Sequence, residues 1–426
     1  MAREKIVVGI DVGSSKVTTL IASVSQEDLT VIGVSSASSR GLRKGQVVDI
    51  EEAVASISES VEAAERMAGV STSSTFVSVG GAHIASTNSH GVVAVAGGEN
   101  EISDEDVRRV TEAARAISIP SSREIIHVIP RDFVVDSQEG IKDPIGMTGV
   151  RLEVETHIIS GAATSLRNLV KCIQQVGIDV EGLVFSGIAS AEATLTDTEK
   201  ELGVALIDIG GGTTDVCLFV EGAIAHSAVI PIGGRNITND LAIGLRSSLE
   251  SAEKIKLELS NQNRKRNPEE EDEEQKGRKD DVLDVSKLGL LEDLGILSKK
   301  TLTDGIIKPR LTEIFTLIGM EIKRSGYAGL LPAGMVLTGG AAETAGIAQV
   351  GKEVLRLPVR IAGPVGITGL IDEISSPAFS TPVGLLVYGN KITTVATGGV
   401  SMPSIKGSSL VDGAKRVLNW LRSFLP

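Results

Sequence analysis

Short apolar runs bounded by glycine or aspartate recur along this chain and predict buried β-strands. Two pairs of such runs, within residues 6–22 and 205–219, are each joined by a short turn that contains glycine. Each pair predicts a β-hairpin. In both hairpins the first strand leads into an aspartate, Asp11 or Asp208, just before the turn.

The two turns contain residue types that let a backbone approach an anion closely. A plain tight hairpin explains either turn equally well when it is considered alone. However, residues 10–15 align with residues 207–212, which suggests two related halves whose turns face each other and hold a polyphosphate from both sides. The residues assigned to this clamp are Gly13, Ser14, Ser15, Lys16, Gly210, Gly211, Gly212, Thr213 and Thr214.

The aspartate beside each turn suggests a magnesium site. Mg²⁺ prefers few direct carboxylates and keeps much of its water shell next to phosphate oxygens. We therefore expect Asp11 and Asp208 to hold the ion through water.

A third glycine site follows the apolar run at residues 335–337. This run leads into Gly339, Gly340 and Ala341, and we expect a helix directly after them. Such a strand end lets the backbone approach a ligand.

Glu253 and Lys256 stand three residues apart on a predicted helix and hence on one face. They are candidates to hold a ribose and flank a base. An ordinary surface pair is the alternative.

Helical periodicity is present at residues 49–68, 104–116, 166–176, 233–259 and 306–322. Ser103 is in position to cap the second of these helices. Around that helix, strand-like runs at 125–129, 133–135 and 152–159 predict a separate α/β domain inserted at residues 84–159.

Composition and charge narrow the possible partners. The net charge of −13 and the aromatic content of 2% argue against nucleic acid, which is held by basic groups and stacked aromatic rings. Cys172 and Cys217 lie in apolar contexts and predict buried thiols in a reducing compartment. The charge run at 261–281 is typical of a solvated loop, with a docking site for a charged peptide as the alternative.

The C-terminal segment has the pattern of a membrane-surface helix. Residues 391–408 are rich in Gly, Ser and Thr and predict a flexible linker before the helix at 409–426. Its apolar face, with tryptophan at the boundary, comprises Val411, Val417, Leu418, Trp420, Leu421, Phe424 and Leu425. Its basic face has Lys415, Arg416 and Arg422, which favour anionic lipid. A helix docked on its own protein is the alternative.

The first apolar run stops at Asp11, and no apolar stretch reaches the roughly 20 residues that a spanning helix needs. We therefore expect a cytosolic protein that the C-terminal helix ties to a membrane.

The segments 11–16, 208–215 and 337–341 resemble, in this order, the two phosphate motifs and the adenosine motif of the actin-like superfamily. That superfamily includes actin, heat-shock chaperones and sugar kinases. The resemblance implies a two-lobed α/β fold of the ribonuclease H-like type around a nucleotide cleft. Within the superfamily the chain looks like the FtsA family of bacterial cell-division proteins, most specifically at residues 138–147 and 149–155.

The resemblance implies ATP and magnesium as cofactors, with adenosine held by Gly234, Glu253, Lys256, Gly339, Gly340 and Ala341. Residues 189–193 resemble the hinge helix of the family. There Glu192 matches the residue that orients the attacking water, although it could equally be a helix residue with no chemical role. We expect at most a slow ATPase, with nucleotide acting mainly as an assembly switch.

The resemblance also implies a domain plan. The first lobe comprises 1–83 and 160–195, the insert 84–159, the second lobe 196–232 and 303–390, and a second-lobe subdomain 233–302. The linker and the terminal helix follow.

The implied function is to self-assemble and to anchor FtsZ filaments to the cytoplasmic face of the cell membrane at the division septum. The FtsZ C-terminal tail is expected to dock on 233–302, where the charge run at 261–281 departs from the family pattern. Later division proteins are expected at the insert.

Two alternative functions fit the same motifs. A sugar kinase would need an acceptor pocket with a catalytic base. A pilus-assembly scaffold similar to PilM would lack the terminal helix and the pattern at 140–155.

Overall fold

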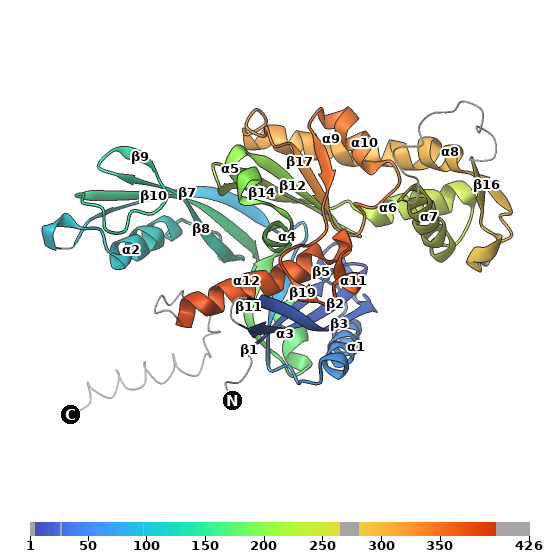
Figure 1. Cartoon of the computed structure of the whole chain (residues 1–426), viewed down its shortest axis with the longest axis horizontal. Coiled ribbons are helices and arrows are strands. Elements are labelled where there is room, and N and C mark those ends of the chain that lie inside the picture. Colours follow the sequence, from blue (N-terminus) through green and yellow to red (C-terminus); the bar gives the residue numbers. More distant parts are fainter. Residues whose placement is uncertain (1–4, 26–27, 97, 265–280, 398–426) are drawn as a thin grey trace. The chain divides into compact units, whose positions relative to one another are not determined.

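The computed structural model describes residues 5–25, 28–96, 98–264 and 281–397 (Figure 1). The chain forms two compact units, Met1–Asn390 and Lys391–Pro426. Within the described ranges, no helix is long and apolar enough to cross a membrane.

The first lobe is built on a six-stranded sheet in the order β11-β6-β1-β2-β3-β19. Its strands are β1 (Lys5–Val12), β2 (Lys16–Ser25), β3 (Asp28–Ser38), β6 (Ser74–Val79), β11 (Asp179–Phe185) and β19 (Thr368–Gly369). Strands β1, β2 and β3 are antiparallel, whereas β6 runs parallel to β1 and β11 runs parallel to β6. A small hairpin formed by β4 (Leu42–Arg43) and β5 (Gln46–Val47) follows β3 in the sequence.

The second lobe repeats this arrangement with the sheet order β14-β13-β12-β17-β18. Its strands are β12 (Val204–Ile209), β13 (Thr214–Val220), β14 (Ala223–Ile230), β17 (Met335–Thr338) and β18 (Val359–Ile361). Again three strands, β12, β13 and β14, pair antiparallel, whereas β17 runs parallel to β12 and β18 runs parallel to β17. The internal repeat inferred from the two hairpins therefore extends to whole sheets.

The first lobe contains the helices α1 (Ile50–Ala68) and α3 (Ala163–Gln175), and local sequence signals account well for α1. The Asp49 side chain accepts from the backbone N–H of Glu52 and caps α1, which ends at Gly69 in the left-handed conformation. The predicted apolar face of α1 is buried, and so are both cysteines.

The insert has its own sheet, in the order β7-β10-β8-β9, and its own small hydrophobic core. Its elements are β7 (Ala85–Ala94), α2 (Asp104–Arg115), β8 (Arg123–Val135), β9 (Gln138–Ile141) and β10 (Arg151–Ala162). The prediction of separate runs at 125–129 and 133–135 is wrong, because β8 is continuous. A bulge between the pairs Thr156–Pro130 and Glu155–Asp132 lets the strand pass Pro130, which has no N–H to pair.

The second-lobe subdomain differs from the expected single helical region at 233–259. It contains α6 (Gly234–Leu245) and α7 (Leu249–Arg264), because Arg246 adopts a left-handed conformation with φ of 54° and ends α6. Residues 261–264 of the predicted charged loop belong to α7, and 265–280 lie outside the described residues. The pair β15 (Val282–Asp284) and β16 (Ile296–Ser298) follows, and then α8 (Lys299–Leu302).

The starting points of two further helices differ from those predicted. A π-helical turn at Thr303–Ile307 precedes α9 (Lys308–Ser325). The helix expected directly after Gly340 does not form there, since α10 (Ile347–Leu355) begins only after a series of turns.

Chain segments that cross between the lobes include α4 (Ser186–Thr194), α5 (Asp197–Leu202), α11 (Ile371–Ile374) and α12 (Ser380–Thr397). Helices α4 and α12 pack so closely that a Cβ at Gly384 would lie 1.7 Å from the carbonyl oxygen of Ala189. The linker predicted from residue 391 is wrong at its start, because 391–397 continue α12. The remainder of the linker and the predicted terminal helix lie outside the described residues.

Candidate functional site

The turns of the two lobe hairpins have the same construction. In the first, the Gly13 N–H donates to the Lys16 carbonyl at 3.1 Å, and in the second the Gly210 N–H donates to the Thr213 carbonyl at 2.9 Å. Each turn follows directly on its aspartate-containing strand, β1 or β12. The aligned sequences therefore give the same local structure twice.

The structure brings these two turns into contact. A Cβ at Gly211 would lie 2.0 Å from Ser15 Oγ, and one at Gly212 would lie 3.0 Å from Ser14 Cβ. Ser14 Oγ in turn accepts from the Gly45 N–H at 2.9 Å, which fixes the first turn. Larger residues at 211 and 212 would push the turns apart, so glycine is required by the close approach.

Asp11 lies at the base of the first turn. Its Oδ1 accepts a hydrogen bond of 2.7 Å from Ser78 Oγ, and the same hydroxyl accepts from the Val12 N–H. Burial raises the pKa of Asp11 to about 6, against the opposing effects of the Ser78 hydrogen bond and the nearby Lys16 charge.

Asp208 lies at the base of the second turn and is 6% exposed. Its Oδ2 accepts hydrogen bonds from the hydroxyls of Ser190 and Thr381. Burial raises its pKa, although both hydroxyls favour the ionised form. Gly339, with φ of 87°, approaches the same carboxylate so closely that a Cβ there would lie 2.2 Å from Asp208 Oδ1.

Asp215 is a third carboxylate at this site, and it was not among the predicted site residues. It pairs with Asp208 across β12 and β13 and is 5% exposed. Its Oδ1 has no hydrogen-bond partner among the described residues. Its pKa is raised well above the usual range by burial and by the charges of Asp208 and Asp11. The available sequence signal was its place at the end of the 208–215 segment, which resembles a phosphate motif.

These carboxylates suit a cation held through water. In the described part of the chain, no group of three or more His, Cys, Asp or Glu side chains has the arrangement of a direct metal site. The unpartnered Asp215 oxygen and the two predicted aspartates are hard oxygen donors of the kind that Mg²⁺ prefers.

Lys16, Thr213 and Thr214, which were assigned to the phosphate clamp, make different contacts. Lys16 Nζ lies 4.0 Å from the centre of the Phe379 ring, and burial lowers its pKa. Thr214 Oγ1 donates to the Ile232 carbonyl at 2.8 Å and so is engaged within its own lobe. Thr213 supplies the carbonyl that closes the turn.

The third glycine segment joins the second hairpin through backbone hydrogen bonds. The Ala341 N–H donates to the Ile209 carbonyl, and the Gly234 N–H at the start of α6 donates to the Gly210 carbonyl, both at 2.9 Å. A Cβ at Gly234 would lie 2.9 Å from Ala341 Cβ and 3.8 Å from Lys256 Nζ. The predicted adenosine residues are therefore neighbours.

Lys256 is not an ordinary surface lysine. It is 7% exposed, and its Nζ donates to Thr238 Oγ1 at 2.9 Å and to Glu253 Oε2 at 2.7 Å. The Glu253 side chain, by contrast, is 42% exposed. The pair thus has one buried cation and one carboxylate that reaches solvent.

An open cavity of about 470 Å³ lies beside this group. Its lining includes Ser260 from α7, residues 343–349 after the glycine pair, and Pro377. Sequence reasoning missed these lining residues. A pocket of this size suits a small organic ligand.

The Glu192 side chain does not point toward Asp208. It follows Ser190 by two positions in α4, and two helical positions differ by about 200° around the axis. Ser190 points to Asp208, whereas Glu192 lies 3.8 Å from Lys200 Nζ of α5. The predicted membrane residues, from Val411 to Leu425, lie outside the described residues.

Comparisons with known proteins agree with this architecture. Residues 81–160 match the family described as "SHS2 domain inserted in FTSA", and residues 205–384 match the family "Cell division protein FtsA". The first match coincides closely with the insert predicted at 84–159.

Relatives match over nearly the whole chain. The chain is 41% identical to "Cell division protein FtsA" of Pseudomonas aeruginosa, over 95% of this chain and 93% of the relative. It is 35% identical to the protein of the same name from Escherichia coli K12, over 98% of each.

Among solved structures, a "PilM-PilN type IV pilus biogenesis complex" matches with a TM-score of 0.62 and 14% identity, over 90% of this chain and 98% of that one. MreB5 of Spiroplasma citri bound to ADP matches with a TM-score of 0.53 and 12% identity, over 93% of this chain and 99% of that one. These similarities show the fold and confirm the predicted two-lobed actin-like architecture. The two matched domains and the full-length relatives establish that the chain belongs to the FtsA family of cell division proteins.

Proposed function

We propose that this protein binds ATP with magnesium between its lobes and uses the nucleotide as a switch for self-assembly on the membrane. The observation that carries the proposal is the convergence of three glycine-containing segments. Two of them meet as opposed turns, at Gly211 and Ser15, and the third contacts Gly234 at Ala341.

Each part of the site has a proposed task. The turns hold the phosphates through backbone N–H groups, and Asp11 and Asp208 hold magnesium through its water shell, with Asp215 beside them. The buried Lys256 and the exposed Glu253 carboxylate hold the ribose, while the base enters the 470 Å³ cavity. The fold shared with an ADP-bound MreB5 supports this assignment.

The test is a glycine substitution that blocks the site without straining the fold. Gly340 is exposed, and the nearest atom to a Cβ there is Ala378 Cβ, at an ordinary 3.7 Å. Gly340→Phe should therefore fold and place its side chain beside Ala378, next to Pro377 of the proposed base site. We expect the affinity for a fluorescent ATP analogue to fall at least about tenfold, a cost of ~1.4 kcal/mol.

Gly329→Phe is the matched control, since Gly329 is also exposed and has no atom within 4 Å of its Cβ position. It should bind like the wild type. Equal affinity of the Gly340→Phe variant, with its circular dichroism spectrum unchanged, would refute the site.

We also propose that the protein anchors FtsZ filaments to the cytoplasmic face of the septal membrane. Its support comes from the amphipathic pattern at 409–426 and from membership in a cell-division family. The described part of the 233–302 subdomain also exposes large apolar side chains, with Ile243 77%, Leu291 80% and Ile296 70% exposed. Exposed apolar groups of this kind suit the docking of a peptide such as the FtsZ tail.

We propose at most slow hydrolysis. Turnover needs a group that orients water in line with the γ-phosphate, and Glu192 faces away from Asp208. A single-turnover assay with Glu192→Gln should therefore give the same rate as the wild type. A large loss of rate would restore the catalytic role predicted for Glu192.

A further inference from the structure

The insert is fixed firmly to the first lobe. On β8, His127 Nε2 accepts the Phe185 N–H from the end of β11 at 2.9 Å, and His127 Nδ1 lies 3.3 Å from Tyr388 OH of α12. At the start of β8, Arg123 donates to the His83 carbonyl at 3.0 Å. Since His127 is 7% exposed, its contacts with the first lobe are buried.

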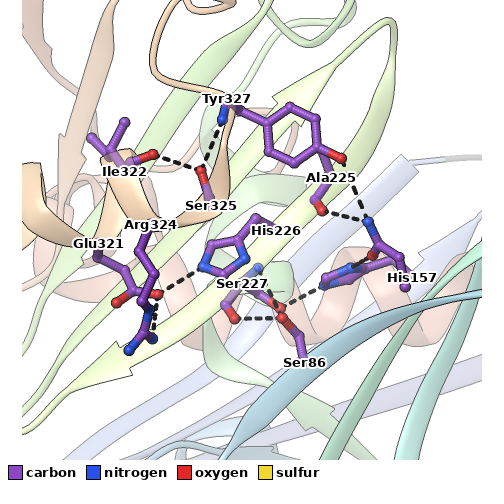
Figure 2. Close-up of polar contacts among 11 residues, drawn as sticks. Ser86, His157, Ala225, His226, Ser227, Glu321, Ile322, Arg324, Ser325 and Tyr327 are labelled. Atoms are coloured by element: carbon purple, nitrogen blue, oxygen red, sulfur yellow. Dashed lines mark hydrogen bonds and ion pairs between the residues drawn. The ribbon is translucent and has the colours of Figure 1, made fainter.

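The insert also meets the second lobe along β14, through a set of side chains that we call the β14 junction: Ser86, Asn88, His157 and Ser227. Ser86 Oγ donates to the Ser227 carbonyl at 2.7 Å and accepts from the Ser227 N–H at 3.3 Å. Asn88 Nδ2 donates to the Ala225 carbonyl at 3.3 Å. Figure 2 shows Ser86, His157 and Ser227 meeting between the insert and the second lobe.

His157 is the centre of the β14 junction and is 1% exposed. Its Nδ1 lies 2.7 Å from Asn88 Oδ1, and its Nε2 lies 2.7 Å from Ser227 Oγ. Because Asn88 Oδ1 can only accept, His157 Nδ1 donates to it, and Nε2 accepts from the Ser227 hydroxyl. Both ring nitrogens are satisfied by residues from different domains.

A second group of contacts supports the junction at its edge. Arg131 of β8 donates to Glu155 at 2.6 Å and to Tyr327 OH at 3.3 Å. On the second-lobe side, His226 lies 2.8 Å from Glu321, which also accepts from Arg324 (Figure 2). Tyr327 thus ties the end of α9 to the insert.

We propose that the insert is a strut that holds the two lobes at a fixed angle and thereby slows the release of nucleotide. This inference rests on the proposed nucleotide site. That site lies between turns that touch, at Gly211 and Ser15, so a ligand held there leaves only when the lobes separate. The lobes are also joined where α4 packs on α12 at Gly384, and this crossing serves as the hinge. Rotation about the hinge breaks the β14 junction, where the buried His157 and Ser227 then lose their partners.

The experiment compares two serine-to-alanine variants of the same strand in the full-length protein. Ser86→Ala removes hydrogen bonds to Ser227 across the junction. Ser89→Ala is the matched control, because Ser89 Oγ donates at 2.7 Å to the Ala114 carbonyl inside the insert. Both serines are half-buried.

Stopped-flow dissociation of a fluorescent ATP analogue gives the first measurement. We expect release from Ser86→Ala to be on the order of fivefold faster than from the wild type, because the variant loses both half-buried hydrogen bonds to Ser227. Release from Ser89→Ala should stay within about twofold of the wild type. Unchanged release from Ser86→Ala, or equal acceleration in both variants, overturns the strut.

Hydrogen exchange measured without nucleotide tests the link between insert and second lobe independently of the proposed nucleotide binding. Ser86→Ala should raise exchange in β14, and Ser89→Ala should leave it unchanged. If the wild type binds no nucleotide, the proposed function fails, and this exchange pattern still decides whether the junction ties the lobes. Equal exchange in β14 of all three proteins overturns that tie.

Discussion

Thr381 Oγ1 lies 3.0 Å from Asp208 Oδ2 and donates a hydrogen bond to this buried carboxylate. Thr381 also contacts the Ser190 hydroxyl at 2.9 Å, so α4, α12 and β12 meet at one side chain. The contact joins residues that are 173 positions apart in the chain.

Thr381→Val should remove this donor at nearly constant volume. A hydrogen bond in a folded protein typically contributes about 0.5–1.5 kcal/mol, so we expect a loss of unfolding free energy of about this size at pH 7. Urea unfolding followed by circular dichroism measures it. Thr381→Ser keeps the hydroxyl and should lose less, whereas equal stability of wild type and Thr381→Val would contradict this account of Asp208.

Binding of magnesium with nucleotide should weaken as the pH falls through about 6. Burial raises the pKa of Asp11 to about 6, and a protonated Asp11 cannot attract the water shell of a cation. Calorimetric titrations at pH 7.5 and 5.5 measure the change. Asp11→Asn should lack this part of the pH dependence, so identical profiles for both proteins would contradict the role of Asp11.

Acid should destabilise the protein partly through His157. Burial lowers its pKa to about 3, whereas an unfolded histidine titrates near 6.5. The neutral native histidine therefore contributes stability that is complete above about pH 6.5 and is lost as the pH falls toward 3. His127, with a pKa lowered to about 4 by burial, acts in the same direction.

His157→Gln isolates this contribution. Between pH 6 and 4 the wild type should lose about 1.4 kcal/mol more unfolding free energy per pH unit than the variant does. Urea unfolding at several pH values gives both slopes. Parallel stability curves would show that His157 is not held neutral in the folded protein.

The membrane proposal predicts that removal of residues 409–426 abolishes sedimentation with anionic vesicles. A sharper comparison uses two glutamate substitutions at neighbouring positions of the full chain. Leu421→Glu places a charge on the predicted apolar face, and Asn419→Glu places one on the polar face. We expect a much larger loss of vesicle binding for Leu421→Glu. Retained binding by the truncated protein would rule out this anchor.

Sequence patterns were most informative where structure is local. The two hairpins, the helix α1 and α2 with its Ser103 cap form as predicted, because turn geometry, helical periodicity and capping involve residues within a few positions of one another. Errors arose where one residue overrides a pattern. Arg246 ends α6 in a left-handed conformation inside an apparently continuous helix, and a bulge carries β8 past Pro130.

The sequence by itself determined the repeated strand–aspartate–turn segments, because each of them depends on a few contiguous residues. Only the tertiary structure decided that Lys256 is buried, that Asp215 joins the acidic group and that Glu192 faces Lys200. It also decided that His157 of the insert bonds to Ser227 of the second lobe. The physical reason is that burial and electrostatic environment depend on which distant segments of the chain pack together. Local sequence patterns do not reveal those long-range contacts.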